Sequence, residues 1–222
     1  MPVSAGSFMM GSPVSESGHR ADETAHPVTL TKPFWLGRTP VTQAQYEAVM
    51  GNNPARFKGA DFPVETVSWE EAMTFCRKLT ERERAAGRLP EGFVYTLPTE
   101  AQREYACRAG TGGRYAGELE AIAWYSGNSD EQAHAVAQKQ PNAWGLFDMQ
   151  GNVWEWCLDW YGDYREGKAI DPTGPAKGDG RVYRGGAWFH SGDLCRSAYR
   201  YKLAPTERGS LLGFRVALSP VR

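Results

Sequence analysis

Several features that define whole classes of protein are missing from this sequence. Its 25 lysines and arginines are matched by 26 acidic residues, so no basic excess indicates binding to nucleic acid or to an anionic membrane. No stretch approaches the roughly 20 apolar residues of a membrane-spanning helix, so we expect no membrane insertion. The first residues have neither the charged nor the apolar region of a secretory signal peptide, which predicts a cytoplasmic protein.

Cysteine is scarce, and the four cysteines lie far apart in the sequence. Cys76, Cys107, Cys157 and Cys195 form no Cys-x-x-Cys pair, which argues against a zinc ribbon or a thioredoxin-like site. Scattered cysteines also fit a reducing compartment. Cys76 and Cys107 fall at apolar positions of predicted helices, so we expect both to be packed thiols of the core.

Tryptophan, glycine and proline are abundant, with 8, 25 and 14 copies in 222 residues. Glycine and proline limit regular structure, whereas each tryptophan buries a large area. Together they predict a fold with few long elements and many ordered loops. No linker composition or internal repeat divides the chain, so we predict a single domain over residues 1–222.

Three capping boxes predict three helices, all in the first half of the chain. The boxes are Thr42-x-x-Gln45, Ser68-x-x-Glu71 and Thr99-x-x-Gln102, and the helices should end before Gly51, Gly87 and Gly110. Short strands are predicted at residues 8–10, 26–30, 34–36, 182–184 and 214–218. Residues 110–180 have almost no periodic pattern but hold five of the eight tryptophans, so we expect packed loops there.

The sharpest local motif is Gly151-Asn-Val-Trp-Glu-Trp156. In an extended segment Trp154 and Trp156 point to one side and Glu155 to the other. Glu155 and nearby backbone carbonyls would then supply the hard oxygen ligands that calcium prefers. Alternatively, Glu155 caps a turn or pairs with an arginine, because one carboxylate is weak evidence for a metal.

Nine segments, in order along nearly the whole chain, resemble the sulfatase-modifying-factor family, whose namesake is the formylglycine-generating enzyme. They are residues 8–12, 38–46, 63–69, 97–100, 105–110, 141–146, 151–156, 184–188 and 213–215. The resemblance implies a C-type-lectin-like α+β fold with few short strands, about three helices and much irregular structure.

The resemblance also implies structural calcium ions that brace the loops. One ion would be bound by Gly151, Asn152, Val153 and Glu155. A second would match Asn128 and Ser129, with carbonyls near Ala137 and Lys139.

The family enzyme binds copper through two cysteines five residues apart, and here those positions are His190 and Cys195. A histidine and a cysteine would not reproduce a linear dithiolate. The resemblance therefore implies a non-catalytic module that binds a ligand or a protein, with Cys195 as a packed thiol. The alternative is a copper oxidoreductase that acts on a cysteine thiol of a peptide or small molecule, with Cys195 and His190 at the metal. Whether the chain is an enzyme stays open.

The six residues Phe189–Leu194 share no physical property, yet each can be encoded by changing only the adenines of an asparagine codon. The same holds for Tyr201, Leu203 and Ser210–Leu212. This pattern resembles the variable proteins that retroelements diversify, although ordinary drift of a loop gives the same residues. We expect these positions to form a concave binding surface for an unidentified protein or small molecule. The predicted binding residues are Trp188, Phe189, His190, Ser191, Asp193, Leu194, Tyr201, Lys202, Leu203, Ser210 and Leu212.

Overall fold

A computed structural model describes residues 1–164 and 167–221, so three positions of the predicted single domain lie outside the described residues. Four α-helices are present in the described ranges: α1 (Gln43–Met50), α2 (Trp69–Ala85), α3 (Glu100–Arg108) and α4 (Leu119–Ile122). Two short 3-10 turns, η1 (Ala21–Glu23) and η2 (Gly192–Cys195), add to them. None of these helices has the length and apolar character needed to cross a membrane.

The first three helices begin at the predicted capping boxes. In each box the cap hydroxyl accepts the backbone N–H three residues on, and the glutamine or glutamate there accepts the cap N–H in return. Helix α1 ends at Gly51, whose φ of 84° lies in the left-handed region that favours glycine. Local capping interactions therefore determine where these helices begin. The sequence predicted their first and last residues to within two positions.

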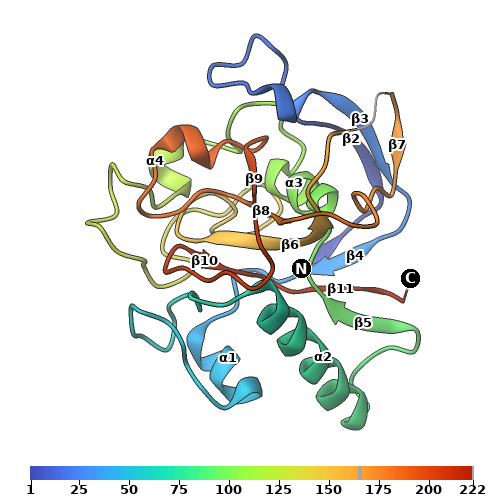
Figure 1. The fold of residues 1–222 in the computed structure, drawn as a ribbon, viewed down its shortest axis with the longest axis vertical. Helices are drawn as coiled ribbons and strands as arrows, with labels where there is room; N and C mark the ends of the chain where they lie inside the picture. Colours follow the sequence, from blue (N-terminus) through green and yellow to red (C-terminus); the bar gives the residue numbers. More distant parts are fainter. Residues whose placement is uncertain (165–166, 222) are drawn as a thin grey trace.

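The strands form three small sheets (Figure 1). The first has the order β1 (Pro2–Val3), β4 (Phe34–Leu36), β11 (Ala217–Pro220), β5 (Phe93–Thr96). The second has the order β10 (Leu212–Gly213), β6 (Trp154–Trp160), β8 (Arg181–Arg184), β9 (Arg200–Leu203). The third has the order β2 (Gly6–Met10), β3 (His26–Leu30), β7 (Ala169–Ile170).

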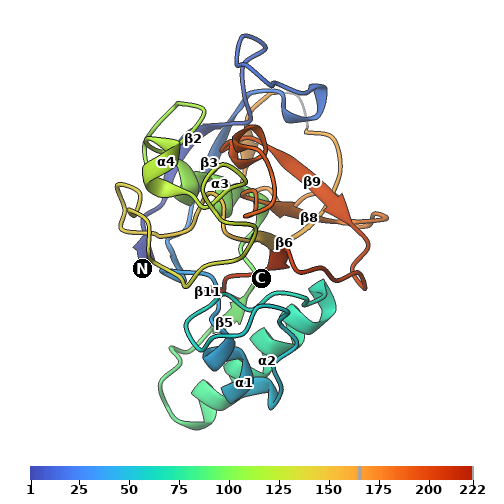
Figure 2. The same ribbon diagram turned by 90° about the vertical axis from the view of Figure 1, so that its left-hand side faces the viewer.

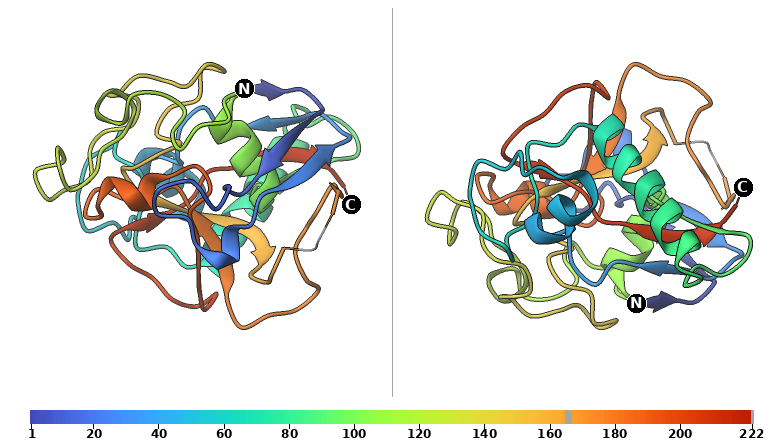
Figure 3. Two further views of the ribbon diagram at one scale, coloured as in Figure 1. Left: turned by 90° about the horizontal axis from the view of Figure 1, so that it is seen from above. Right: turned by 90° about the horizontal axis from the view of Figure 1, so that it is seen from below.

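The helices lie on different sides of these sheets. Helices α1 and α2 pack together below the first sheet, and α3 lies higher, where it contacts β2, β6 and β8 (Figures 1 and 2). Both termini lie near the first sheet, since β1 and β11 both pair with β4 (Figure 3). The α+β class predicted from the sequence is confirmed.

Two predictions about regular structure were wrong. The last strand does not span 214–218, because β11 begins at Ala217, while Phe214 is buried beside Tyr46 and Phe75. The stretch 110–180 contains α4, β6 and β7 rather than loops alone. Strand β9 escaped prediction because Arg200 is its buried residue, and a buried charge hides the alternation of apolar side chains.

Candidate binding surface

A double-glycine turn carries the chain from the end of β8 to the predicted binding segment. Gly185 and Gly186 have φ of 107° and 79°, both in the left-handed region. A Cβ at Gly186 would lie 2.4 Å from the Cys195 sulfur, so this turn requires glycine on two grounds. The turn thus packs directly against the end of η2.

Buried arginines anchor the segment to the core. Arg184 pairs with Glu100 at 3.0 Å and with Glu104, and Arg200 donates to both oxygens of Glu100 at 2.7 Å. Burial alone would raise the pKa of Glu100, but the two arginines outweigh it and hold that pKa below the usual range. The segment between Arg184 and Arg200 is therefore held at both ends on one carboxylate.

The structure separates the predicted binding residues into exposed and buried ones. Phe189 and Tyr201 are 59% and 44% exposed, which is unusual for large aromatic side chains. Most of the others reach the surface at least in part; they are His190, Ser191, Asp193, Leu194, Lys202, Leu203 and Ser210. Leu212 was wrongly predicted as a binding residue, because it is 4% exposed, pairs with Trp154 through β10 and packs in the core.

Trp188 is buried too, so it supports the surface rather than forming it. Its indole N–H donates to the Ser210 carbonyl at 3.2 Å, and its ring meets Phe57 edge-on. Its backbone N–H donates to the Asn152 carbonyl at 2.9 Å. The Ser129 hydroxyl donates to the Trp188 carbonyl at 2.7 Å. These bonds fix the backbone on which Phe189 is presented.

Aromatic rings continue from this point in one connected set, which we call the aromatic row. Centroids of contacting rings lie 5.1–6.0 Å apart, the range of favourable aromatic contacts, and the set branches at Trp154, which contacts both Tyr183 and Tyr199. The row consists of Phe57, Trp188, Phe189, His190, Trp154, Tyr183, Tyr199 and Tyr201. Arg20 lies over both Tyr199 and Tyr201 at 5.4 and 5.9 Å from their centroids.

The row draws on segments that are distant in sequence. The chain from β8 to β10 and the loops of residues 120–140 lie on the same side of the molecule, which faces the viewer in Figure 2. The Ser126 N–H donates to the His190 carbonyl at 3.0 Å and joins the two segments. Sequence reasoning missed Phe57, Tyr183, Tyr199 and Arg20, because no motif marks them and their contacts are non-local.

Cys195 lies beneath this surface and not on it. Its side chain is fully buried, and burial raises the pKa of its thiol to about 12. The Gln150 amide donates to the Cys195 carbonyl at 2.7 Å, which holds the residue in place. The residue five positions before it is His190, so the pair of cysteines needed for a linear Cu(I) dithiolate is absent here. The structure thus supports the prediction of a packed thiol.

Glu155 pairs with arginines, as the alternative interpretation proposed. Arg215 donates to both carboxylate oxygens at 2.7 Å, and Arg103 donates to one at 3.0 Å. Burial would raise the pKa of Glu155, but the two guanidinium groups outweigh it and lower that pKa. The structure therefore shows the arginine pairing of this carboxylate, and calcium at Glu155 stays a prediction. Trp154 and Trp156 pack in the core on the other side of β6, as predicted.

Other predicted calcium ligands are also engaged within the protein. The Asn152 amide exchanges hydrogen bonds with the backbone of His134 at 3.0 and 3.1 Å. The Asn128 side chain accepts from the Tyr125 N–H and donates to Glu120 and Ala123. Within residues 1–164 and 167–221, no three histidine, cysteine or acidic side chains gather in an arrangement that could hold a metal ion by themselves.

The residues whose backbone carbonyls were predicted to bind calcium also make contacts within the protein. Gly151 packs against the Trp124 backbone, Val153 is in the buried interior, and the Ala137 N–H donates to Asp148 at 2.8 Å. The Lys139 ammonium lies over Trp124 at 4.1 Å and donates to the Glu120 carbonyl. A structural calcium held by carbonyls of this region stays a prediction.

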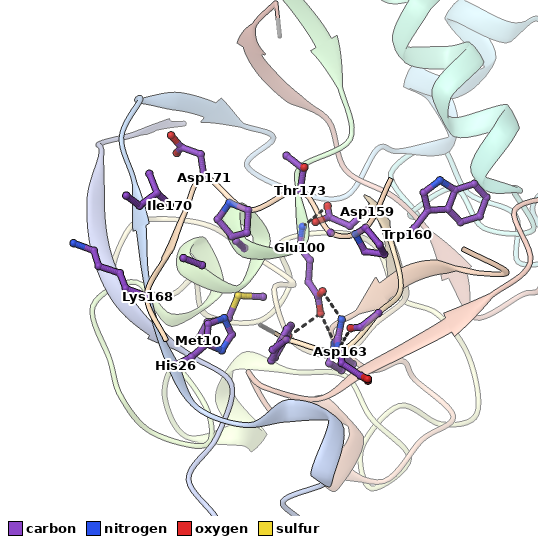
Figure 4. Close-up of a pocket in the computed structure, with 18 residues that line it drawn as sticks. Met10, His26, Glu100, Asp159, Trp160, Asp163, Lys168, Ile170, Asp171 and Thr173 are labelled. Atoms are coloured by element: carbon purple, nitrogen blue, oxygen red, sulfur yellow. Dashed lines mark hydrogen bonds and ion pairs between the residues drawn. The ribbon is translucent and has the colours of Figure 1, made fainter. Parts of the chain in front are cut away.

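A cavity of about 510 Å³ lies away from the aromatic row (Figure 4). Its lining includes the end of β6, residues 162–164, β7 and residues 171–175, together with Glu100 and Arg200. None of the predicted site residues lines it. Because Arg200 neutralises Glu100 there, these two lining residues already serve the frame that anchors the binding segment.

A family model described as "Sulfatase-modifying factor enzyme 1-like domain" matches residues 1–220. The chain belongs to the sulfatase-modifying factor family. The resemblance inferred from the nine segments is thereby confirmed, and the fold is the C-type-lectin-like fold of that family.

Two solved structures and two curated enzymes are similar to this chain. The solved structure of Treponema denticola variable protein 1 is 34% identical, with a TM-score of 0.89 over 99% of this chain and 94% of its own. PvdO from Pseudomonas aeruginosa is 29% identical, with a TM-score of 0.86 over 98% and 93%. The formylglycine-generating enzyme of Streptomyces coelicolor is 36% identical over 83% of this chain, which spans 60% of that enzyme. The chain spans about half of the mouse enzyme, 53%.

Proposed function

We propose that this chain is a non-catalytic binding module whose ligand is a protein, and that the ligand covers the exposed part of the aromatic row. The observation that carries the proposal is the exposure of Phe189 and Tyr201 on a segment held rigidly by buried ion pairs. Aromatic side chains on a rigid backbone are typical centres of protein interfaces, since they bury large area and lose little conformational entropy.

The similarity to a variable protein over nearly the whole chain supports the finer hypothesis that the exposed positions of this segment are diversified. The residues that can be encoded by changing only the adenines of an asparagine codon include both highly exposed aromatics, whereas the frame of Gly186, Arg184 and Arg200 is buried. A diversified binding surface requires variable residues that are exposed and a frame of buried residues that does not change. A nearby template repeat that matches codons 182–218 except at adenines would support diversification, and its absence would contradict it.

Copper oxidoreductase activity is the weaker candidate. Its metal would have to reach Cys195, whose side chain is fully buried beneath the surface. The Nδ1 atom of His190 already accepts a hydrogen bond from Trp154 at 3.0 Å. A tight stoichiometric Cu(I) complex that disappears in Cys195→Ala would revive this candidate.

The binding proposal can be tested by selection from a phage-displayed library of genomic fragments of the source organism. Enriched fragments should bind the purified chain and fail to bind Phe189→Ala and Tyr201→Ala. Ile170→Ala is the matched control, because Ile170 is 62% exposed but lies by the cavity of Figure 4. The proposal fails if fragments bind both aromatic variants as well as they bind the unchanged chain.

A further inference from the structure

His190 lies in the middle of the aromatic row and has a hydrogen bond that decides its chemistry. The indole N–H of Trp154 lies 3.0 Å from the His190 Nδ1 atom. An indole nitrogen donates and never accepts, so Nδ1 must be the acceptor and carry no proton. In the neutral ring the proton is therefore on Nε2.

The backbone of His190 is held by two hydrogen bonds, which fix the point from which its side chain starts. The His190 N–H donates to the Ala187 carbonyl at 3.0 Å, and its carbonyl accepts from Ser126. The rings of Phe189 and Trp154 flank the imidazole at 6.0 and 5.6 Å. Turning the ring over would place a carbon atom in front of the indole N–H in place of Nδ1, so the bond from Trp154 favours one orientation and one tautomer.

Unlike Nδ1, the Nε2 atom of His190 makes no hydrogen bond within the described part of the protein. It is also not one of the buried atoms that lack a partner there. It therefore keeps some accessible area on a half-buried residue. Phe189 exposes 59% of its area directly beside it.

We infer that Trp154 holds His190 as the Nε2–H tautomer, and that the surface recognises a protein segment presenting an uncharged carbonyl oxygen between apolar side chains. This inference rests on the proposed function, because it names the chemistry of the ligand at that same surface. The Nε2–H is the donor, and Phe189 and its neighbouring rings supply the apolar contact.

A carboxylate fits this position less well than a carbonyl. A carboxylate would favour the doubly protonated imidazole, whose second proton must go to Nδ1. That proton would face the indole N–H and break the bond from Trp154. Burial also lowers the pKa of His190, and no charged group contributes to that shift. The ring thus stays a neutral donor at neutral pH, which suits a neutral acceptor.

The tautomer is tested first in the unbound protein by two-dimensional ¹⁵N–¹H NMR of the histidine ring. The expected spectrum has an unprotonated Nδ1 and a protonated Nε2 at pH 7. A protonated Nδ1, or a doubly protonated ring at that pH, would overturn the inference. Trp154→Phe should relax the ring to a mixture of tautomers, which provides an internal control.

The donor role is tested with fragments from the genomic selection and a matched pair of variants. The His190→Gln amide nitrogen reaches the position of Nε2, whereas that of His190→Asn reaches only the position of Nδ1. We expect His190→Gln to bind within about threefold of the unchanged chain and His190→Asn to bind about tenfold more weakly. Thermal melts establish that both variants are folded.

The experiments give different results if the inference about His190 is wrong and if the proposed binding function is wrong. If binding depends on Phe189 and Tyr201 but both His190 variants bind equally, the inference is wrong and the binding surface stands. If no fragment depends on Phe189 or Tyr201, the proposed function fails, while the NMR spectrum still decides the tautomer. Selected fragments that lose binding when one Asp or Glu is changed to Asn or Gln, and lose it only towards the chain with His190 intact, would indicate a carboxylate ligand and overturn the carbonyl assignment.

Discussion

Glu155→Gln should destabilise the protein strongly, whether or not calcium is present. The substitution removes the carboxylate that neutralises Arg103 and Arg215, both of which are fully buried. It keeps the size of the side chain, so the packing of β6 should change little. What changes is the charge: two guanidinium groups would remain in the interior without a counterion.

The magnitude follows from the contacts. Glu155 accepts three charge-assisted hydrogen bonds, two from Arg215 and one from Arg103. Removing one partner of a buried ion pair costs about 3–5 kcal/mol, because the remaining charge is left uncompensated. For a chain of this length that loss corresponds to a fall in Tm of about 10 °C. Glu47→Gln, on the exposed side of α1, should change stability by less than about 0.5 kcal/mol.

Urea denaturation followed by circular dichroism measures the effect, with parallel samples in calcium and in chelator. We predict the same loss for Glu155→Gln in both. A loss below about 1 kcal/mol would contradict the ion-pair account. So would chelation that destabilises the unchanged chain but leaves Glu155→Gln unaffected, because the carboxylate would then act through the ion. Chelation that lowers the Tm of both would support calcium held by other ligands.

Three further predictions follow from the same contacts. Arg200 and Arg184 lower the pKa of Glu100 below its ordinary 4.5. The stability that ionised Glu100 contributes should therefore be complete above about pH 4.5 and be lost as the pH falls through the lowered pKa. A free energy of unfolding that does not decline below pH 4.5 would contradict this prediction. The four buried cysteines, Cys195 with a pKa of about 12 among them, should react with a thiol reagent at pH 8 only on unfolding, so rapid labelling of the native protein would contradict the packing described. Gly186→Ala should lower the free energy of unfolding, measured in urea, by at least about 2 kcal/mol. The added Cβ would overlap the Cys195 sulfur, and the φ of 79° disfavours alanine. An unchanged free energy of unfolding would refute the steric argument.

Local chemistry explains why some elements could be predicted from the sequence. The capping box at Thr42 needs only residues 42–45, and its helix was found where expected. The alternation of Trp154, Glu155 and Trp156 likewise predicted which side chains share a face. The partners of Glu155 could not be predicted, since Arg103 and Arg215 are 52 and 60 residues away.

In the binding surface, too, local sequence predicted some residues and missed those placed by long-range contacts. The codon pattern marked Phe189 and Tyr201, and both are exposed. It also marked Leu212, which is buried, because pairing of β10 with β6 turns that side chain inward. Phe57 joins the surface through a contact with Trp188, 131 positions later in the sequence, and no local pattern reports such a contact.

The most direct test of the binding surface is the affinity of selected genomic fragments, measured by calorimetry for matched variants. The double variant Phe189→Ala/Tyr201→Ala removes the two most exposed rings of the row. Central aromatic residues of an interface each contribute about 2 kcal/mol or more, so this variant should bind at least about 100-fold more weakly. Ile170→Ala should bind within about twofold of the unchanged chain. An unchanged affinity of the double variant, or a large loss in Ile170→Ala alone, would contradict the account.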